Sequence, residues 1–144
     1  MTATTTTTSG RQARGSLLDR ALALNGVLSL GSGALMTVAP GTVGSALGVN
    51  GSGWIRLVGA GLLGHAALLA YAMTRDDRRP WGRLNLAAIA PYPLAMIALA
   101  VLVVSDGAGR LLVLGDGALI AGIAAMHWAG LRRSRPPTID RPDS

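Results

Sequence analysis

The side chains of this sequence that could do chemistry are few, and they lie within long apolar stretches. The polar groups inside these stretches are Asn25, Arg56, His65, Asn85, Asp116 and His127. Each is costly in hydrocarbon, so each should face a partner. Asp116 is the candidate general acid or proton carrier, and Arg56 and His127 are further candidate catalytic groups. The candidate substrate-binding residues are Asn25, His65, Asn85 and Tyr92.

Several kinds of site are excluded or disfavoured by the residues present. The chain has no cysteine, which excludes disulfides, thiolate catalysis and cysteine-based metal or haem attachment. It contains no HExxH and no Ser/His/Asp pattern. His65 and His127 should differ in depth by roughly 7 Å along their helices, whereas the two axial ligands of one haem must be level. We therefore predict no metal and no cofactor.

Four apolar stretches must position these side chains. They cover residues 21–38, 54–73, 84–104 and 111–131. Each is close to the ~20 residues that a helix needs to cross ~30 Å of hydrocarbon. No water is available there to satisfy an open backbone, so the stretches must be helical. The predicted fold is all-α, a four-helix transmembrane bundle of residues 17–133.

Arginine in the short flanks of the spans sets the expected orientation. The chain has no lysine, and its 13 arginines, apart from Arg56 and Arg110, lie before the first span, between the second and third, or after the fourth. The first gap, 40–53, carries no charge, and the third holds only Asp106 and Arg110. By the positive-inside rule both termini should be cytoplasmic.

Composition and charge indicate the class of partner. Half of the 144 residues are hydrophobic, as expected for a membrane protein. A chain of this length is expected to be too short for a further folded domain beside four spans. The net charge of +6 would suggest nucleic acid in a soluble protein. Here the arginines sit where anionic lipid attracts them. We expect a multi-pass plasma-membrane protein with membrane lipids and no nucleic acid as partners, and with a homodimer or larger membrane complex as further options.

The two ends of the chain differ from the middle. Residues 1–16 contain a threonine run with little apolar surface, and residues 134–144 contain three prolines and several charges. Both compositions predict disordered tails. A signal peptide is the alternative at the start, but Pro40 and the length of the apolar run favour an uncleaved first helix.

Small residues in the spans predict close helix packing. Gly59, Gly61 and Gly64 spell a dinucleotide-binding pattern, but no strand precedes them and no acidic residue follows at the required distance. Small residues one helical turn apart instead let backbones approach closely in a membrane. Such pairs are Ala60 with Gly64, Ser29 with Gly33 and Ala118 with Gly122.

Depth along each helix predicts which polar groups meet. At ~1.5 Å per residue, Arg56 and Asp116 lie within about one turn of each other near the outer side, which predicts an ion pair or, failing that, an arginine that reaches the headgroups. Asn25, Asn85 and His127 lie within about two turns of the inner side. They are expected to form one polar cluster, with Trp81 and Trp128 at the interface.

Two prolines should bend the third span. Pro91 and Pro93 flank Tyr92, and each removes a backbone donor, so carbonyls one turn earlier lose their partner. A kink near the middle of the membrane is expected. It either fits the span to its neighbours or exposes carbonyls to a substrate cavity.

Three runs carry a resemblance to known proteins. APGTVGSALGV, WIRLVGAGLLGHAALL and HWAGLRR resemble the small four-helix bacterial membrane proteins of the DoxX-like and related uncharacterised families. In those a proline and a short loop follow the first helix, the second helix carries Arg-x-x-Gly, and the fourth ends in basic residues. Pro40, Arg56 with Gly59, and Arg132 with Arg133 match this pattern over residues 17–133. The resemblance implies a fold and a membrane location, not a reaction.

Three functional hypotheses follow from the sequence. The first is a structural or accessory membrane protein with an intramembrane polar site. The second is a membrane-embedded enzyme, a cyclase or a cofactor-free oxygenase, acting on a lipophilic biosynthetic intermediate. The third is a small dimeric transporter with Asp116 as its coupling site, although the small multidrug resistance transporters use a glutamate in the first helix and this chain has none.

The orientation can be tested with reporter fusions at the two termini. Because the arginine-rich flanks should remain on the inner side, both fusions are expected to report a cytoplasmic location. A periplasmic signal from either terminus would contradict the argument from arginine.

Overall fold

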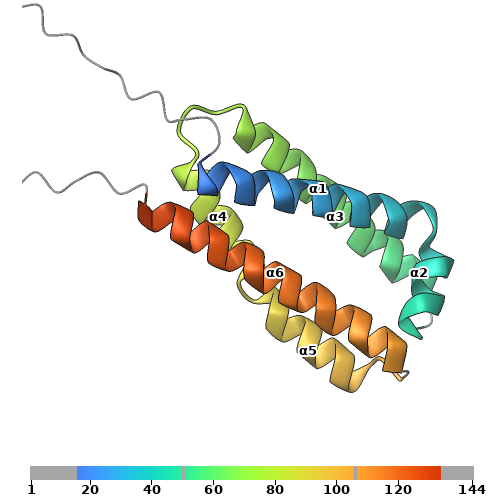
Figure 1. Cartoon of the computed structure of the whole chain (residues 1–144). Helices are drawn as coiled ribbons and strands as arrows, with labels where there is room; N and C mark the ends of the chain where they lie inside the picture. Colours follow the sequence, from blue (N-terminus) through green and yellow to red (C-terminus); the bar gives the residue numbers. More distant parts are fainter. Residues whose placement is uncertain (1–15, 50, 106, 134–144) are drawn as a thin grey trace, which may run out of the picture.

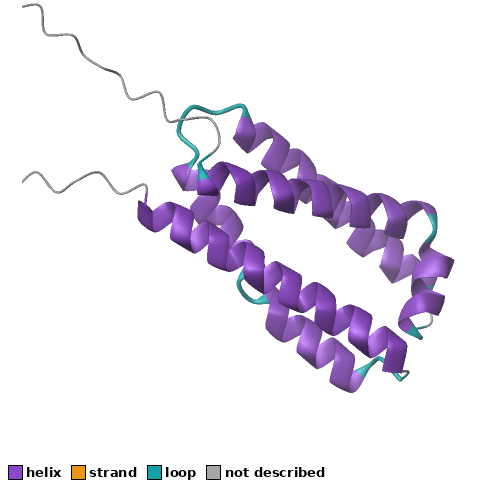
Figure 2. Cartoon of the chain, viewed as in Figure 1, coloured by secondary structure: helices purple, strands orange, loops and turns teal. Residues whose placement is uncertain are grey.

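The computed structural model describes residues 16–49, 51–105 and 107–133, and within these ranges every regular element is an α-helix (Figures 1 and 2). The helices are α1 (Leu17–Val38), α2 (Pro40–Leu47), α3 (Ser52–Met73), α4 (Arg79–Ile89), α5 (Tyr92–Leu102) and α6 (Gly107–Arg133). Four segments are long and apolar enough to cross a membrane: α1, α3, α4 together with α5, and α6. The predicted four-helix membrane bundle is confirmed. Except for Ser16, the tails predicted at 1–16 and 134–144 lie outside the described residues.

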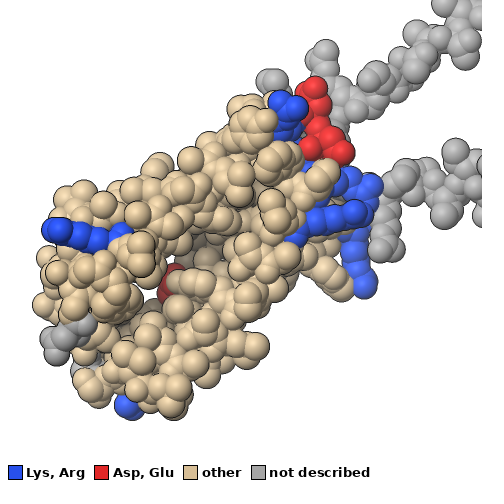
Figure 3. Space-filling model, turned by 180° about the vertical axis from the view of Figure 1, so that it is seen from behind, with Lys and Arg blue, Asp and Glu red and all other residues tan. Residues whose placement is uncertain are grey.

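The bundle is built from two helix pairs. α1 packs along α3, α5 packs along α6, and α4, which belongs to the same span as α5, also packs on α6. The two pairs join mainly through contacts of α1 with α6. The start of α1, the α3–α4 connection and the end of α6 lie at one end of the molecule, while α2 lies at the other (Figure 1). Most of the described arginines gather at the first end (Figure 3). We call it the arginine-rich end, and the other the opposite end.

The outer surface of the bundle is apolar. Large hydrophobic side chains stand exposed on every span, among them Val27 at 66%, Leu57 at 74% and Leu94 at 72% exposure. A surface of this kind is unfavourable in water and favourable in hydrocarbon. These side chains therefore face lipid.

Glycine allows a close helix contact between α1 and α3. A Cβ added at Gly59 would lie 2.7 Å from Thr37 Oγ1, 2.8 Å from Met36 Cβ and 2.9 Å from the Gly33 carbonyl oxygen. The Thr37 hydroxyl donates a 2.7 Å hydrogen bond to that same carbonyl, so it too occupies the crossing. Only glycine fits here. Of the predicted small-residue pairs, Ser29 and Gly33 are buried at this contact, whereas the pairs Ala60 with Gly64 and Ala118 with Gly122 are exposed, and a Cβ at Gly64 or Gly122 would meet nothing within 4 Å.

The third span is broken where the prolines predict. α4 ends at Ile89 and α5 begins at Tyr92, with Ala90 and Pro91 between them. Pro91 and Pro93 have no N–H to continue the helical ladder, so the chain changes direction at this point. The expected kink is confirmed, and it places Tyr92 at the start of α5.

The segment after Pro40 differs from the expectation. The resemblance predicted a short loop, whereas the chain forms the eight-residue helix α2. Proline at the first helical position already has the φ angle that a helix needs. Gly48 then ends the helix in the left-handed conformation with φ of 65°. Proline therefore starts a helix here rather than a loop.

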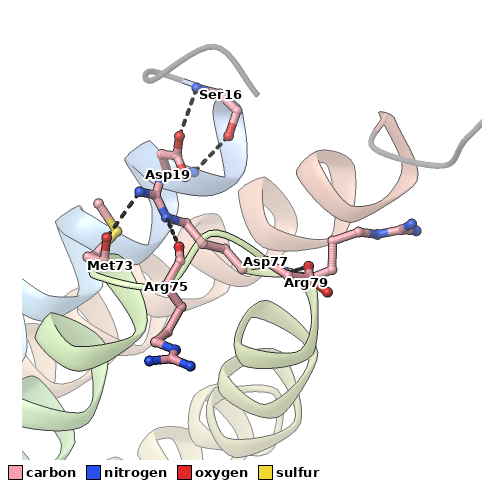
Figure 4. Close-up of polar contacts among 7 residues, drawn as sticks. Ser16, Asp19, Met73, Arg75, Asp77 and Arg79 are labelled. Carbon is pink, nitrogen blue, oxygen red and sulfur yellow. Dashed lines mark hydrogen bonds and ion pairs between the residues drawn. The ribbon is translucent and has the colours of Figure 1, made fainter. Parts of the chain in front are cut away.

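An ion pair that we did not predict fastens the arginine-rich end (Figure 4). Arg78 Nη1 lies 2.6 Å from Asp19 Oδ1, and Arg78 Nη2 donates to the Met73 carbonyl at 3.0 Å. Asp19 also accepts from the Ser16 backbone N–H, while the Asp19 N–H donates to Ser16 Oγ. This capping box orients Asp19, so the pair holds the start of α1 against the end of α3.

The glycine crossing can be tested with two substitutions in one helix. Gly59→Ala is expected to destabilise the protein by about 1–3 kcal/mol, because the new methyl group meets backbone and side-chain atoms of α1. Gly61→Ala is the matched control, since a Cβ there meets nothing within 4 Å. Thermal unfolding in detergent measures both. Equal stability of the two variants would contradict the proposed crossing.

A candidate intramembrane binding site

A cavity of about 300 Å³ lies between the α1–α3 pair and the α5–α6 pair. Figure 3 shows a hollow in the apolar surface with an acidic side chain set back inside it. α3 packs mainly on α1 and α2, and α5 packs mainly on α6, so these two helices flank the cavity without extensive mutual contact. The cavity is therefore reached from the lipid-facing side of the bundle.

Residues at helical spacing line the cavity from each span. From α1 these are Asn25, Leu28, Ser29, Ser32 and Met36, and from α6 they are Leu112, Val113, Asp116 and Ile120. From α3 they include Ile55, Val58, Leu62 and His65, and from the third span Ile89, Tyr92, Met96 and Leu99. Each set covers one helix face, because side chains three and four residues apart point the same way. The lining is mostly apolar, with a few polar groups.

Tyr92 and Asp116 form the polar pair on the cavity wall. The Tyr92 hydroxyl donates a 2.7 Å hydrogen bond to Asp116 Oδ2, and both side chains are partly buried. The proline break positions Tyr92 for this contact, since it starts α5 beside α6. A phenol that donates to a carboxylate makes a charge-assisted bond, stronger than one between neutral groups.

The predicted ion pair between Arg56 and Asp116 is wrong. Arg56 is exposed, while its neighbour Ile55 is 1% exposed and lines the cavity. Successive residues of a helix differ by about 100° in direction, so Arg56 points away although its depth is suitable. Its side chain can reach the headgroup layer instead.

A second polar group of residues ties the spans together on the arginine-rich side of the cavity. Asn25 Nδ2 donates to Asn85 Oδ1 at 3.0 Å, and Asn85 Nδ2 lies 2.7 Å from His127 Nε2. Asn25 Nδ2 also lies 3.2 Å from His65 Nε2. The predicted cluster of Asn25, Asn85 and His127 is therefore formed. We call these three residues and His65 the amide–imidazole network.

The direction of hydrogen bonding in this network is fixed at His127. Its Nδ1 lies 3.0 Å from the Ile123 carbonyl oxygen, and a carbonyl can only accept. Nδ1 therefore carries the proton and, in the neutral ring, Nε2 accepts from Asn85. At the other end of the network, the amide nitrogen of Asn25 can only donate, so His65 Nε2 is the acceptor. Each of the four spans contributes one residue to the network.

His65 is the member that sequence reasoning did not place in the network. Depth alone separated it from His127, and the two rings are indeed not direct neighbours, since Asn25 and Asn85 stand between them. His65 also lines the main cavity and a smaller one of about 170 Å³ between α3 and α4. No group of three or more His, Cys, Asp or Glu suited to a metal ion occurs in the part of the chain that the structure describes.

The two tryptophans expected beside the cluster make separate contacts near the arginine-rich end. Trp81 meets the ring of Tyr71 edge-on at 5.4 Å between centroids, and the Arg132 guanidinium lies 3.6 Å from the centroid of Trp128. Neither ring has a hydrogen bond to the network among the described residues. These contacts are compatible with the interfacial position expected for both tryptophans.

Comparison of the chain with protein-family models, curated proteins and solved structures finds no match. The argument for function therefore depends on the cavity and the polar groups that line it.

The structural role of the network can be tested at Asn85. Asn85→Leu is expected to destabilise the bundle by about 1–3 kcal/mol, because Asn25 and His127 both lose a partner where no water can replace it. Ser32→Ala removes a hydroxyl from the cavity wall without touching the network and should change stability much less. Unfolding of both variants in detergent gives the comparison. Equal stability would show that the network does not hold the spans together.

Proposed function

We propose that this protein binds a lipophilic small molecule in its intramembrane cavity. The observation that carries the proposal is the Tyr92–Asp116 pair on the wall of a mostly apolar cavity. A few polar groups in an apolar cavity of about 300 Å³ or more are typical of small-molecule sites. A polar pair within a membrane span is itself a sign of function.

The cavity makes the first of the sequence hypotheses more specific. A structural polar pair would be enclosed between packed helices, as the buried contact of Asn85 with His127 is. Tyr92 and Asp116 instead border open space beside α3. Binding without chemistry is the function that this geometry supports best. From the arginine pattern we further propose an accessory protein of the plasma membrane with both termini in the cytoplasm.

A membrane-embedded enzyme is the second candidate, and one observation favours it. Asp116, Tyr92 and His65 line a single cavity, so groups able to accept and donate protons would surround one ligand. The cyclase or cofactor-free oxygenase reaction would then depend on these three. Arg56 and His127 are not among the lining residues, so neither would contact the substrate in this cavity.

Adjacent positions of α1 give a test of the cavity. Ser32 lines it, whereas Gly31 is exposed and a Cβ there would meet nothing within 4 Å. Ser32→Phe should fill part of the cavity and reduce the amount of bound molecule, while Gly31→Phe adds the same ring on the outside. Mass spectrometry of small molecules that copurify in mild detergent from the native membrane is the measurement.

We expect one defined lipophilic molecule with the unmodified protein and with Gly31→Phe, and its loss with Ser32→Phe. Circular dichroism and elution volume confirm that the variants are folded. The same set of molecules with all three proteins would contradict binding in the cavity.

A further inference from the structure

The charge of Asp116 has no cationic partner among the described residues. Arg56 points outward, and the Arg110 Nε donates to the Val104 carbonyl at 2.9 Å. The ion pair found in the described residues joins Asp19 and Arg78 at the arginine-rich end. We infer that the missing positive charge is supplied by the ligand, so the cavity binds a lipophilic cation whose ammonium group lies against Asp116. This inference rests on the proposed function.

The Asp116 carboxylate lies inside the bundle, where a charge needs a partner. Ionised side chains inside a membrane bundle are costly unless a counter-charge lies close to them. The Tyr92 hydroxyl gives Asp116 Oδ2 one hydrogen bond but no charge. A bound ammonium group would supply the counter-charge, and a protonated amine would supply further donors as well.

The polar groups on the cavity wall near Asp116 determine which hydrogen bonds a ligand can make there. The Tyr92 O–H already donates to Asp116, which leaves lone pairs on its oxygen. Both N–H groups of Asn25 Nδ2 are directed to Asn85 Oδ1 and His65 Nε2, so only the Asn25 carbonyl oxygen remains for a ligand. With the carboxylate, these groups present acceptors around Asp116, while the Ser29 and Ser32 hydroxyls and the protonated Nδ1 of His65 are donors on the same lining. The acceptors around Asp116 suit a ligand group that donates or is positively charged, and the carboxylate disfavours an anion at this place.

The aromatic and methionine side chains of the cavity lining also suit a cation. The aromatic residues Trp54 and Tyr92 line the cavity, and aromatic faces attract ammonium groups. Met36 and Met96 add polarisable thioethers that adapt to the shape of a ligand. A cation with a compact hydrocarbon body therefore matches both the charge and the surface of the cavity.

Two ligands of the same shape separate charge from hydrophobicity. Phenyltrimethylammonium is a cation, and tert-butylbenzene is its neutral isostere. Their affinities for the full-length protein in an uncharged detergent can be compared by saturation-transfer NMR titration, with empty micelles as the blank. We expect the cation to bind about tenfold tighter than the neutral compound, because only the cation pairs with the carboxylate.

Neutralising variants test the assignment to Asp116. Asp116→Asn should weaken cation binding about tenfold and change binding of the neutral isostere less than about twofold. Asp76→Asn removes the same charge from an exposed residue of the α3–α4 connection and should leave both affinities unchanged. Asp116→Glu keeps the charge and should keep the preference for the cation.

The results distinguish failure of this inference from failure of the proposed function. Equal affinity of the two compounds, with both lost in Ser32→Phe, would overturn the cation assignment and leave the cavity as the site. The same would follow if Asp76→Asn weakened cation binding as much as Asp116→Asn. If neither compound bound and Ser32→Phe left the copurified molecules unchanged, the proposed function itself would be wrong. Because the two-ligand comparison needs only the unmodified protein, it decides the matter even if Asp116→Asn does not fold.

Discussion

Hydrocarbon offers no hydrogen-bond partner, so each polar group inside the bundle must be satisfied by another part of the chain or by a ligand. The amide–imidazole network meets this constraint with one residue from each span. Its bonds are short and directional, and a helix that rotated or slid would break at least one of them. The network therefore fixes the register of four helices whose remaining contacts are largely apolar. The glycine crossing of α1 and α3 and the ion pair of Asp19 with Arg78 add two further constraints, one on each side of the network.

The network also has a single direction. The Ile123 carbonyl makes His127 Nδ1 a donor, so His127 Nε2 accepts from Asn85, and the two amides pass this orientation on to His65. Turning Asn25 alone would set its oxygen against Asn85 Oδ1, and turning Asn85, with or without Asn25, would set its oxygen against the accepting Nε2 of His127. A ligand that needed a donor from His65 Nε2 would thus have to reorient both asparagines and break the bond to His127. The Asn25 oxygen is therefore held as an acceptor beside the cavity, because the far end of the network is tied to the backbone of α6.

The sequence predicts the spans well and their rotation poorly. Apolar length and the cost of an open backbone in lipid are properties of the local chain, so the four predicted stretches all appear as helices. The observed helices begin earlier, because polar first-turn residues such as Asp19 belong to the helix but not to the apolar run. Depth correctly grouped Asn25, Asn85 and His127. It failed for Arg56, because depth does not give the direction in which a side chain points. That direction is set by packing at Gly33 and Gly59 and by the break at Pro91, which depend on other helices.

The bundle thus contains two polar layers with different consequences. In the amide–imidazole network both ring nitrogens of His127 are hydrogen-bonded within the chain and the residue is 0% exposed, so this imidazole serves to join helices. The Tyr92–Asp116 layer is matched only in part, since the hydroxyl is used and the negative charge is not offset. A polar group that stays incompletely satisfied beside a cavity lowers its free energy when a suitable ligand arrives. We therefore assign ligand binding to the Tyr92–Asp116 pair, whose negative charge the chain does not offset. The asparagines and histidines of the network hold the helices that carry this pair in place.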